Sequence, residues 1–218
     1  LFLAINIGLV LWSVRPGNLT DAWKYPLFLQ SLFWHHPIFF SEAWTLAIEE
    51  AFYFLFPLLF IAAARLLQVN YTRAIPLVAV FVIAVSPIAR MWVAGGEPLW
   101  DEGIRKVALL RLDAIMVGVL LAWLHRYRID SLHSRPATAI LWFALMGSIA
   151  YVAVMSDAAM NDSLLAKTLL FSVAPWGCAA IIVVGLYRPL PRAVSVPAKV
   201  LAKISYSAYL VNIPVASL

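Results

Sequence analysis

Four ionisable side chains of the sequence stand inside otherwise apolar runs, where they are candidates for chemistry. Glu49 and Glu50 lie in one run, and Arg111 and Asp113 lie in a later one. A charge in hydrocarbon costs at least about 2.5–3.5 kcal/mol, so such residues usually face a cavity or a partner. A guanidinium can bind a carboxylate or a phosphate through two parallel hydrogen bonds. Each residue also has a structural alternative: a buried ion pair, a protonated carboxyl or, for Asp113, a carboxylate favoured at a helix start.

Helical spacing places these charges on defined faces of two expected helices. Glu49 and Tyr53 stack one turn apart, and Glu50 points about a quarter-turn away. The Tyr53 hydroxyl can donate a hydrogen bond to Glu49 or to a substrate. Arg111 shares its face with small residues that allow close helix approach, so we expect both charged faces to point at protein rather than lipid. The small residues are Ala114, Gly118 and Ala122.

The composition indicates that these helices lie in a membrane. Apolar residues make up 64% of the 218 residues and charged residues 12%, and the mean hydropathy is +0.89. A soluble domain has about 45–50% apolar and about 25% charged residues. The net charge of +5 is spread over short loops without a basic, aromatic-interleaved patch, so we expect no nucleic-acid partner. The single cysteine, Cys178, supports neither a disulfide framework nor a metal site.

The apolar runs predict an all-α, polytopic transmembrane helix bundle with about seven spans. Because the chain starts and stops inside apolar runs, we expect residues 1–218 to be a single membrane domain truncated at both ends. Prolines inside several runs predict kinks rather than helix ends. The expected spans are 1–14, 44–64, 74–94, 107–124, 138–155, 164–187 and 202–218.

The loop charges predict an orientation. Lys and Arg are more frequent in loops 65–73, 125–135 and 188–203, which favours a cytoplasmic location for these loops. The less basic set of loops is taken to include Arg90, Arg105 and Lys106.

This orientation places Glu49 and Arg111 at a similar depth in the outer half of the membrane. We therefore expect the two side chains to approach one another, directly or across a polar cavity. Segment 14–43 is too polar and too rich in aromatic residues to span, so we expect it at the interface. His35 and His36 in this segment are interpreted as interfacial polar residues, and His36 is also a candidate for the mouth of the outer cavity.

Three motifs give the chain a resemblance to a known family. The stretch from Trp44 to Tyr53 reads Trp-Thr-Leu-Ala-Ile-Glu-Glu-Ala-Phe-Tyr, and Pro57 follows. It is similar to the signature Trp-Ser-Leu-Ala-Val-Glu-Glu-Gln-Phe-Tyr of the acyltransferase-3 family of integral-membrane O-acyltransferases. The family's later Arg-x-Asp…Gly…Ala stretch matches Arg111 and Asp113 with the small residues after them. Its closing Ile-Ser-Tyr-Ser-x-Tyr-Leu matches 204–210.

Two departures from the family pattern bear on the chemistry. Asn212-Ile213-Pro214 stands where the family usually has His-x-Pro, and Asn cannot carry a proton. The family's first span also carries an arginine followed by an essential histidine, and no such pair precedes residue 44. We therefore expect this chain to be a fragment without the histidine that would act as base, and to be inactive alone.

The resemblance implies acyl transfer, of groups other than amino-acyl groups. The donor would be acetyl-CoA or another acyl-CoA, and the acceptor a hydroxyl of an extracytoplasmic glycan or similar molecule. The protein would lie in a bacterial inner (plasma) membrane and hold no bound cofactor and no metal. In that reading the catalytic residues are Glu49, which would orient the histidine, and Arg111, which would bind an anionic part of the donor or intermediate. The substrate-binding residues would be Trp44, Glu50, Tyr53, Asp113, Tyr206 and Tyr209.

Two other classes of function remain open. A secondary transporter also has intramembrane charges and proline-broken helices, although here the charges lie near one face and no inverted repeat is visible. A non-catalytic membrane scaffold or sensor would keep the packing glycines and aromatic anchors while losing charges. The presence of the four charges from Glu49 to Asp113 argues against it.

Overall fold

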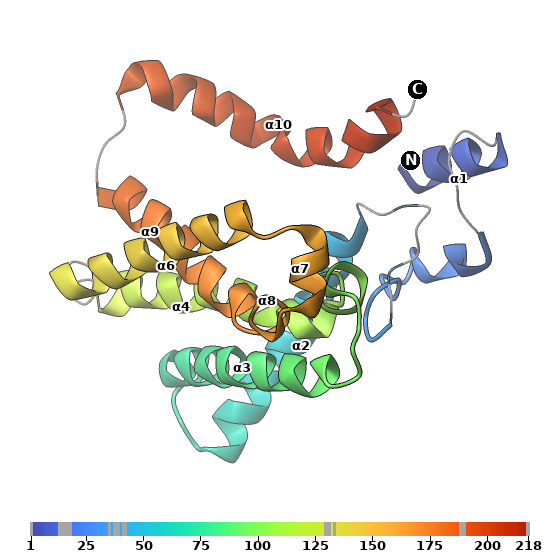
Figure 1. Ribbon diagram of the computed structural model, residues 1–218. Helices are drawn as coiled ribbons and strands as arrows, with labels where there is room; N and C mark the ends of the chain where they lie inside the picture. Colours follow the sequence, from blue (N-terminus) through green and yellow to red (C-terminus); the bar gives the residue numbers. More distant parts are fainter. Residues whose placement is uncertain are drawn as a thin grey trace.

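The computed structural model describes residues 2–12, 19–34, 36, 40, 43–128, 132, 134–187 and 191–216. Over these residues the protein is helical and contains no strand, which confirms the all-α class (Figure 1). Short one-turn elements connect the long helices. The long helices are α2 (Trp44–Leu66), α3 (Tyr71–Ala94), α4 (Leu112–Tyr127), α6 (Arg135–Val154), α9 (Leu170–Tyr187) and α10 (Arg192–Ala216).

Within the part of the chain that the structure describes, four helical stretches are long and apolar enough to cross a membrane, which indicates a membrane protein. The expected count of about seven spans is not confirmed. Helix α1 (Phe2–Leu11) has ten residues in this chain, about 15 Å, and is not one of these four stretches. Helix α10 is long enough, but it is interrupted by charged residues and packs mainly against α1. The four stretches are Trp44–Leu66, Tyr71–Ala94, Ala108–Tyr127 and Arg135–Val154.

The run expected as a span over 164–187 is divided in two. Helix α8 (Leu164–Lys167) ends at Thr168, whose φ of −120° and ψ of −74° are not helical, and α9 begins at Leu170. The Thr168 carbonyl accepts a hydrogen bond of 3.0 Å from Nε of Arg90 on α3. A buried guanidinium thus satisfies the backbone group that the helix break leaves free.

The bundle has two chemically different ends. Helices α3, α4, α6 and α9 pack side by side with short connections at one end, where the Trp123 indole donates to the Thr72 carbonyl at 2.8 Å (Figure 1). We call this the basic end, because Arg65 and Arg73 flank the turn between α2 and α3, and Arg126 and Arg128 lie at the end of α4. The other end, the polar end, is formed by segments 95–111 and 155–169. It contains the one-turn elements η3 (Trp100–Arg105), η4 (Ala108–Arg111), α7 (Asp157–Asp162) and α8.

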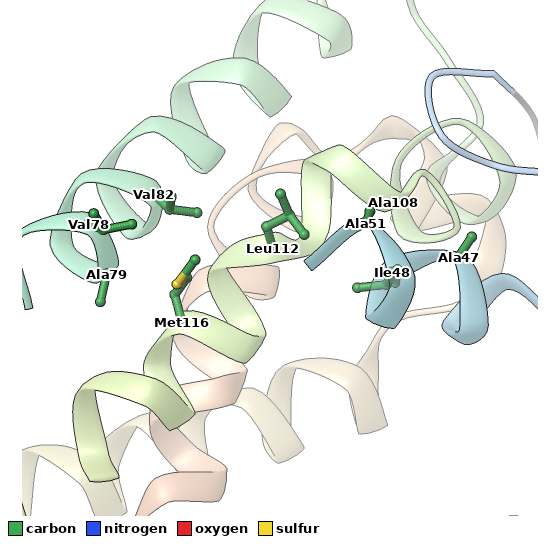
Figure 2. Close-up of a cluster of buried hydrophobic side chains, with 9 residues drawn as sticks. All are labelled: Ala47, Ile48, Ala51, Val78, Ala79, Val82, Ala108, Leu112 and Met116. Atoms are coloured by element: carbon green, nitrogen blue, oxygen red, sulfur yellow. The ribbon is translucent and has the colours of Figure 1, made fainter. Parts of the chain in front are cut away.

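The start of α2 packs at the polar end. Ala47, Ile48 and Ala51 form a buried cluster with Ala108 and Leu112, and further side chains of α3 and α4 complete it (Figure 2). The small alanine side chains of this cluster let α2 approach η4 and the first turn of α4. The remaining members are Val78, Ala79, Val82 and Met116.

Helices α6 and α9 approach one another closely at Gly177. A Cβ added to Gly177 would stand 2.6 Å from Cα of Leu145, a distance that real Cβ atoms do not reach. A Cβ added to Gly118 on α4 would meet nothing within 4 Å. The close approach expected along the small residues of α4 is therefore wrong, and it occurs on α9 instead. The small face of α4 borders open space.

Candidate functional site

The polar end is organised around a buried ion pair between α3 and α4. The Arg90 side chain is 0% exposed and that of Asp113 is 1% exposed. Nη1 of Arg90 lies 3.1 Å from Oδ1 of Asp113, and Nη2 lies 2.6 Å from Oδ2. This is the bidentate geometry in which guanidinium and carboxylate bind most strongly.

All five N–H donors of Arg90 have acceptors. Besides the carboxylate and the Thr168 carbonyl, the Leu110 carbonyl accepts from Nη1 and the Ser172 hydroxyl accepts from Nη2. Arg90 thereby joins α3 to η4, α4, the α8–α9 break and α9. A fully satisfied guanidinium is a structural tie rather than a free binding group.

Both oxygens of the Asp113 carboxylate also accept hydrogen bonds from groups other than Arg90. Its Oδ1 also accepts from the Ala114 backbone N–H at 3.0 Å, and its Oδ2 from the Ser172 hydroxyl at 2.9 Å. With both oxygens engaged and the side chain buried, Asp113 has no surface to offer a substrate. The structure therefore corrects the expected substrate-binding role of Asp113 to a structural one.

Arg90 is the residue that the sequence analysis missed. It was counted as a loop charge, but it lies inside α3, in a stretch that can cross a membrane. The signal was available, because Arg90 is an ionised residue within the apolar run 74–94, by the same criterion that singled out Arg111. What the sequence does not show is that its partner is Asp113, 23 positions further along the chain.

Arg111 is held differently. It is the residue before the first turn of α4, and its Cζ lies 4.3 Å from the centroid of the Phe171 ring on α9. Its Nε is buried without a hydrogen-bond partner, and within the described residues its guanidinium makes no ion pair. The nearest carboxylate in sequence, Asp113, is already occupied by Arg90. The guanidinium at this end is thus available to an anion.

A groove begins at Arg111 and runs between α4 and α9. Its volume is about 340 Å³ and, apart from Arg111, it is lined by uncharged side chains of the two helices. Gly118 and Ala114 form one wall, and Cys178 and Ile182 belong to the other. The groove combines one cation with an apolar channel.

The Glu49 face of α2 is not directed at the bundle, which corrects the expectation. The buried side chains at this end of α2 are Ala47, Ile48 and Ala51, and Glu49 and Glu50 are exposed. Tyr53 is 61% exposed. The charged stripe was assigned to the protein interior because of its cost in lipid, whereas the small residues determine which face packs.

Glu49 and Arg111 lie at the same end of the bundle, because the α2 residues beside Glu49 contact Ala108 and Leu112. No hydrogen bond or ion pair joins Glu49 to Arg111 in the part of the chain that the structure describes. The expected approach of the two side chains is therefore not a direct contact.

Trp44, the first residue of α2, contacts a second charged cluster at the polar end. Cζ of Arg105 lies 5.3 Å from the Trp44 ring and 5.5 Å from the Trp100 ring, within cation–π range. Arg105 also pairs with Asp101, and Nζ of Lys106 lies 2.7 Å from Oδ2 of Asp101. Burial raises the pKa of Asp101, but hydrogen bonds from Arg105 and Lys106 outweigh it and hold that pKa below its ordinary value.

His36 lies beside this cluster and is 4% exposed. Its Nε2 donates to the Phe40 carbonyl at 2.9 Å, which leaves Nδ1 as the unprotonated nitrogen, buried without a partner. Burial lowers the pKa of His36 to about 4, so the ring is neutral at physiological pH. A location at the mouth of a cavity is not supported, since the ring packs against Tyr25.

A second cavity of about 450 Å³ opens between the end of α3 and the α7–α8 region. Lys167 lines it and is 8% exposed, and none of the described residues forms an ion pair with its Nζ. Glu97, Asn161 and Asp162 supply further polar groups. The cavity suits a ligand with several hydroxyl groups.

The other predicted substrate residues are not placed at the site. Tyr206 and Tyr209 lie on α10, and their side chains are outside the described part. Among the described residues, no group of three or more His, Cys, Asp or Glu side chains is arranged to hold a metal ion.

Comparison with known proteins gives no match to a family model, to a curated protein or to a solved structure. The functional assignment therefore depends on the motifs and on the geometry of the polar end.

Proposed function

We propose that the protein is a membrane-bound O-acyltransferase of the acyltransferase-3 type, which moves an acyl group from an acyl-CoA to a hydroxyl of an extracytoplasmic glycan or similar acceptor. Three motifs in family order support the proposal, as do the four apolar helices. The observation that carries it is the state of Arg111, whose guanidinium at the polar end makes no ion pair with any described residue.

Of the two arginines Arg90 and Arg111, only Arg90 has a carboxylate partner among the described residues. An arginine kept in an apolar bundle without a carboxylate is costly, unless an anion binds there. Asp113 cannot serve, because Arg90 and Ser172 engage both of its oxygens. A free guanidinium can bind the phosphates of a coenzyme, or stabilise the oxyanion that develops when a hydroxyl attacks a thioester.

The other residues fit roles around that step. The Arg90–Asp113 pair fixes the start of α4, and so positions Arg111. Glu49 is open to a partner at the same end, where it would orient the histidine that acts as base. The cavity at Lys167 offers hydrogen-bonding groups to a hydroxyl-rich acceptor.

The test is acyl transfer by the full-length protein in native membranes. Labelled acetyl-CoA and longer acyl-CoAs are supplied, and the label in cell-envelope glycans is measured beside the amount of folded protein. Arg111→Lys should abolish transfer at normal protein level, because an ammonium lacks the planar fork. Arg126→Lys, near the basic end, is the matched control and should retain transfer.

Two results would overturn the proposal: full transfer by Arg111→Lys, or no transfer by the wild type from any acyl-CoA supplied. Uptake of a solute into sealed vesicles without covalent acylation would favour the transporter.

A further inference from the structure

The groove between α4 and α9 has the chemistry of a lipid site. One end is formed by Arg111, and the rest of its lining is uncharged. Both helices are apolar, and α4 belongs to a stretch long enough to cross the membrane. A cation at the mouth of an apolar channel complements a molecule with an anionic head and a hydrocarbon chain.

The wall of the groove is open where a chain would lie. No heavy atom stands within 4 Å of a Cβ added to Gly118, and Cys178 on the opposite wall is exposed. Small residues on α4 leave a channel that larger side chains would fill. In a bilayer such a channel is occupied by acyl chains, because an empty apolar void forfeits dispersion contacts.

The head position is defined by Arg111 and Phe171. Cζ of Arg111 lies over the Phe171 ring, 4.3 Å from its centroid, and Nε of Arg111 is buried without a hydrogen-bond partner. Arg90 adds positive charge nearby, but all its donors are used. A phosphate can therefore bind the guanidinium of Arg111 without competing with a carboxylate that is already paired to it.

We propose that this groove binds one anionic phospholipid, with its phosphate on Arg111 and one acyl chain along Ala114, Gly118 and Cys178. The inference does not require acyl transfer. Where the transfer proposal also holds, the lipid phosphate and the anionic part of the acyl donor exclude one another at Arg111.

The first test is native mass spectrometry of the full-length protein released from vesicles that contain equal amounts of phosphatidylglycerol and phosphatidylcholine. The wild type should retain phosphatidylglycerol preferentially. Arg111→Gln should reduce its retention about tenfold, in line with removal of one partner of a close charge pair. Equal retention of the two lipids, or unchanged retention in the variant, overturns the proposal.

A second pair of variants tests the chain site without altering charge. Gly118→Leu fills the groove and should displace the lipid, whereas Gly185→Leu, also in open space but outside the groove, should not. An added Cβ meets no heavy atom within 4 Å at either position, and the amount of folded protein is measured for both variants. Equal lipid retention by the two variants contradicts the assigned groove.

The only cysteine supplies an independent readout. In detergent solution, added phosphatidylglycerol should slow the reaction of Cys178 with N-ethylmaleimide, and Arg111→Gln should abolish that protection. Glycerol phosphate, which has the head but no chain, should not protect. Equal protection by glycerol phosphate would show an anion site without a chain site, and would also overturn the proposal.

Discussion

Arg90 and Asp113 form a bidentate ion pair, with N–O distances of 3.1 and 2.6 Å, between side chains that are 0% and 1% exposed. The pair gives Arg90 and Arg111, two of the arginines at the polar end, different roles. All hydrogen-bond donors of Arg90 are used within the fold, whereas the guanidinium of Arg111 remains available to bind a ligand.

Breaking this pair should destabilise the protein strongly. Asp113→Ala leaves a buried guanidinium without its carboxylate, and removal of one partner of a buried pair costs about 3–5 kcal/mol. Replacing both partners, as in Arg90→Met with Asp113→Leu, should recover part of the loss. Thermal unfolding in detergent measures both effects, with Asp21→Ala, which removes a partly exposed carboxylate, as the control. A loss for Asp113→Ala no larger than for the control would show that the pair does not hold the fold.

Stability should fall as the pH decreases through the range set by His36. Burial, with a smaller effect from Lys106, lowers the pKa of His36 from 6.5 to about 4, against the opposing effects of the Phe40 hydrogen bond and Asp101. Between these values the unfolded chain binds a proton that the folded protein does not. The stabilisation is therefore complete above pH 6.5 and is lost progressively toward pH 4, by about 3 kcal/mol in total.

The check is a comparison of unfolding temperatures at about pH 7 and pH 5. His36→Gln cannot take up the proton, so the variant should lose most of the difference between the two temperatures. If the pH dependence of the unfolding temperature is unchanged in His36→Gln, it arises from titratable groups other than His36.

Gly177 should tolerate no side chain. An added Cβ would lie 2.6 Å from Cα of Leu145, so Gly177→Ala must push α9 away from α6, at a cost of about 1–3 kcal/mol. Gly147→Ala on α6 enters open space, so it should be neutral or stabilise by up to about 1 kcal/mol through helix propensity. Equal unfolding temperatures for the two variants would show that α9 can move away from α6 without loss of stability.

In the full-length protein, Glu49→Gln should abolish acyl transfer and leave the fold intact. The Glu49 carboxylate is exposed on α2, and the amide keeps its shape, so stability should change by less than about 0.5 kcal/mol. Acceptor acylation and folded protein in the membrane fraction are measured together. Surviving activity, or a parallel loss of activity and folded protein, would assign Glu49 a structural role.

The helical class and the central helices follow from the sequence, because long apolar runs in this composition have no other stable form in a membrane. The expected runs 44–64, 74–94 and 138–155 agree closely with α2, α3 and α6. The break at Thr168 does not follow from the sequence, since it depends on a hydrogen bond from Arg90, which is distant in the chain.

The candidate site was predicted less well, because the sequence did not show which face of α2 packs against the bundle. Periodicity showed which residues share a side of α2, but not which side packs. Ala47, Ile48 and Ala51 turn inward because they fit against Ala108, and Glu49 is thereby exposed. The role of Asp113 was missed for a similar reason. Its ion pair with Arg90, 23 positions away in the chain, makes it a structural residue, and the sequence does not show that pairing.

The five acceptors of Arg90 have a consequence for biogenesis. They belong to segments translated after α3, so α3 enters the membrane before any of them exists. Until α4 and the α8–α9 break arrive, the arginine carries its full insertion penalty of about 2.5–3.5 kcal/mol. Arg90 thus makes the stable insertion of α3 depend on the later helices, because a chain that ends before η4 would lack every one of these acceptors.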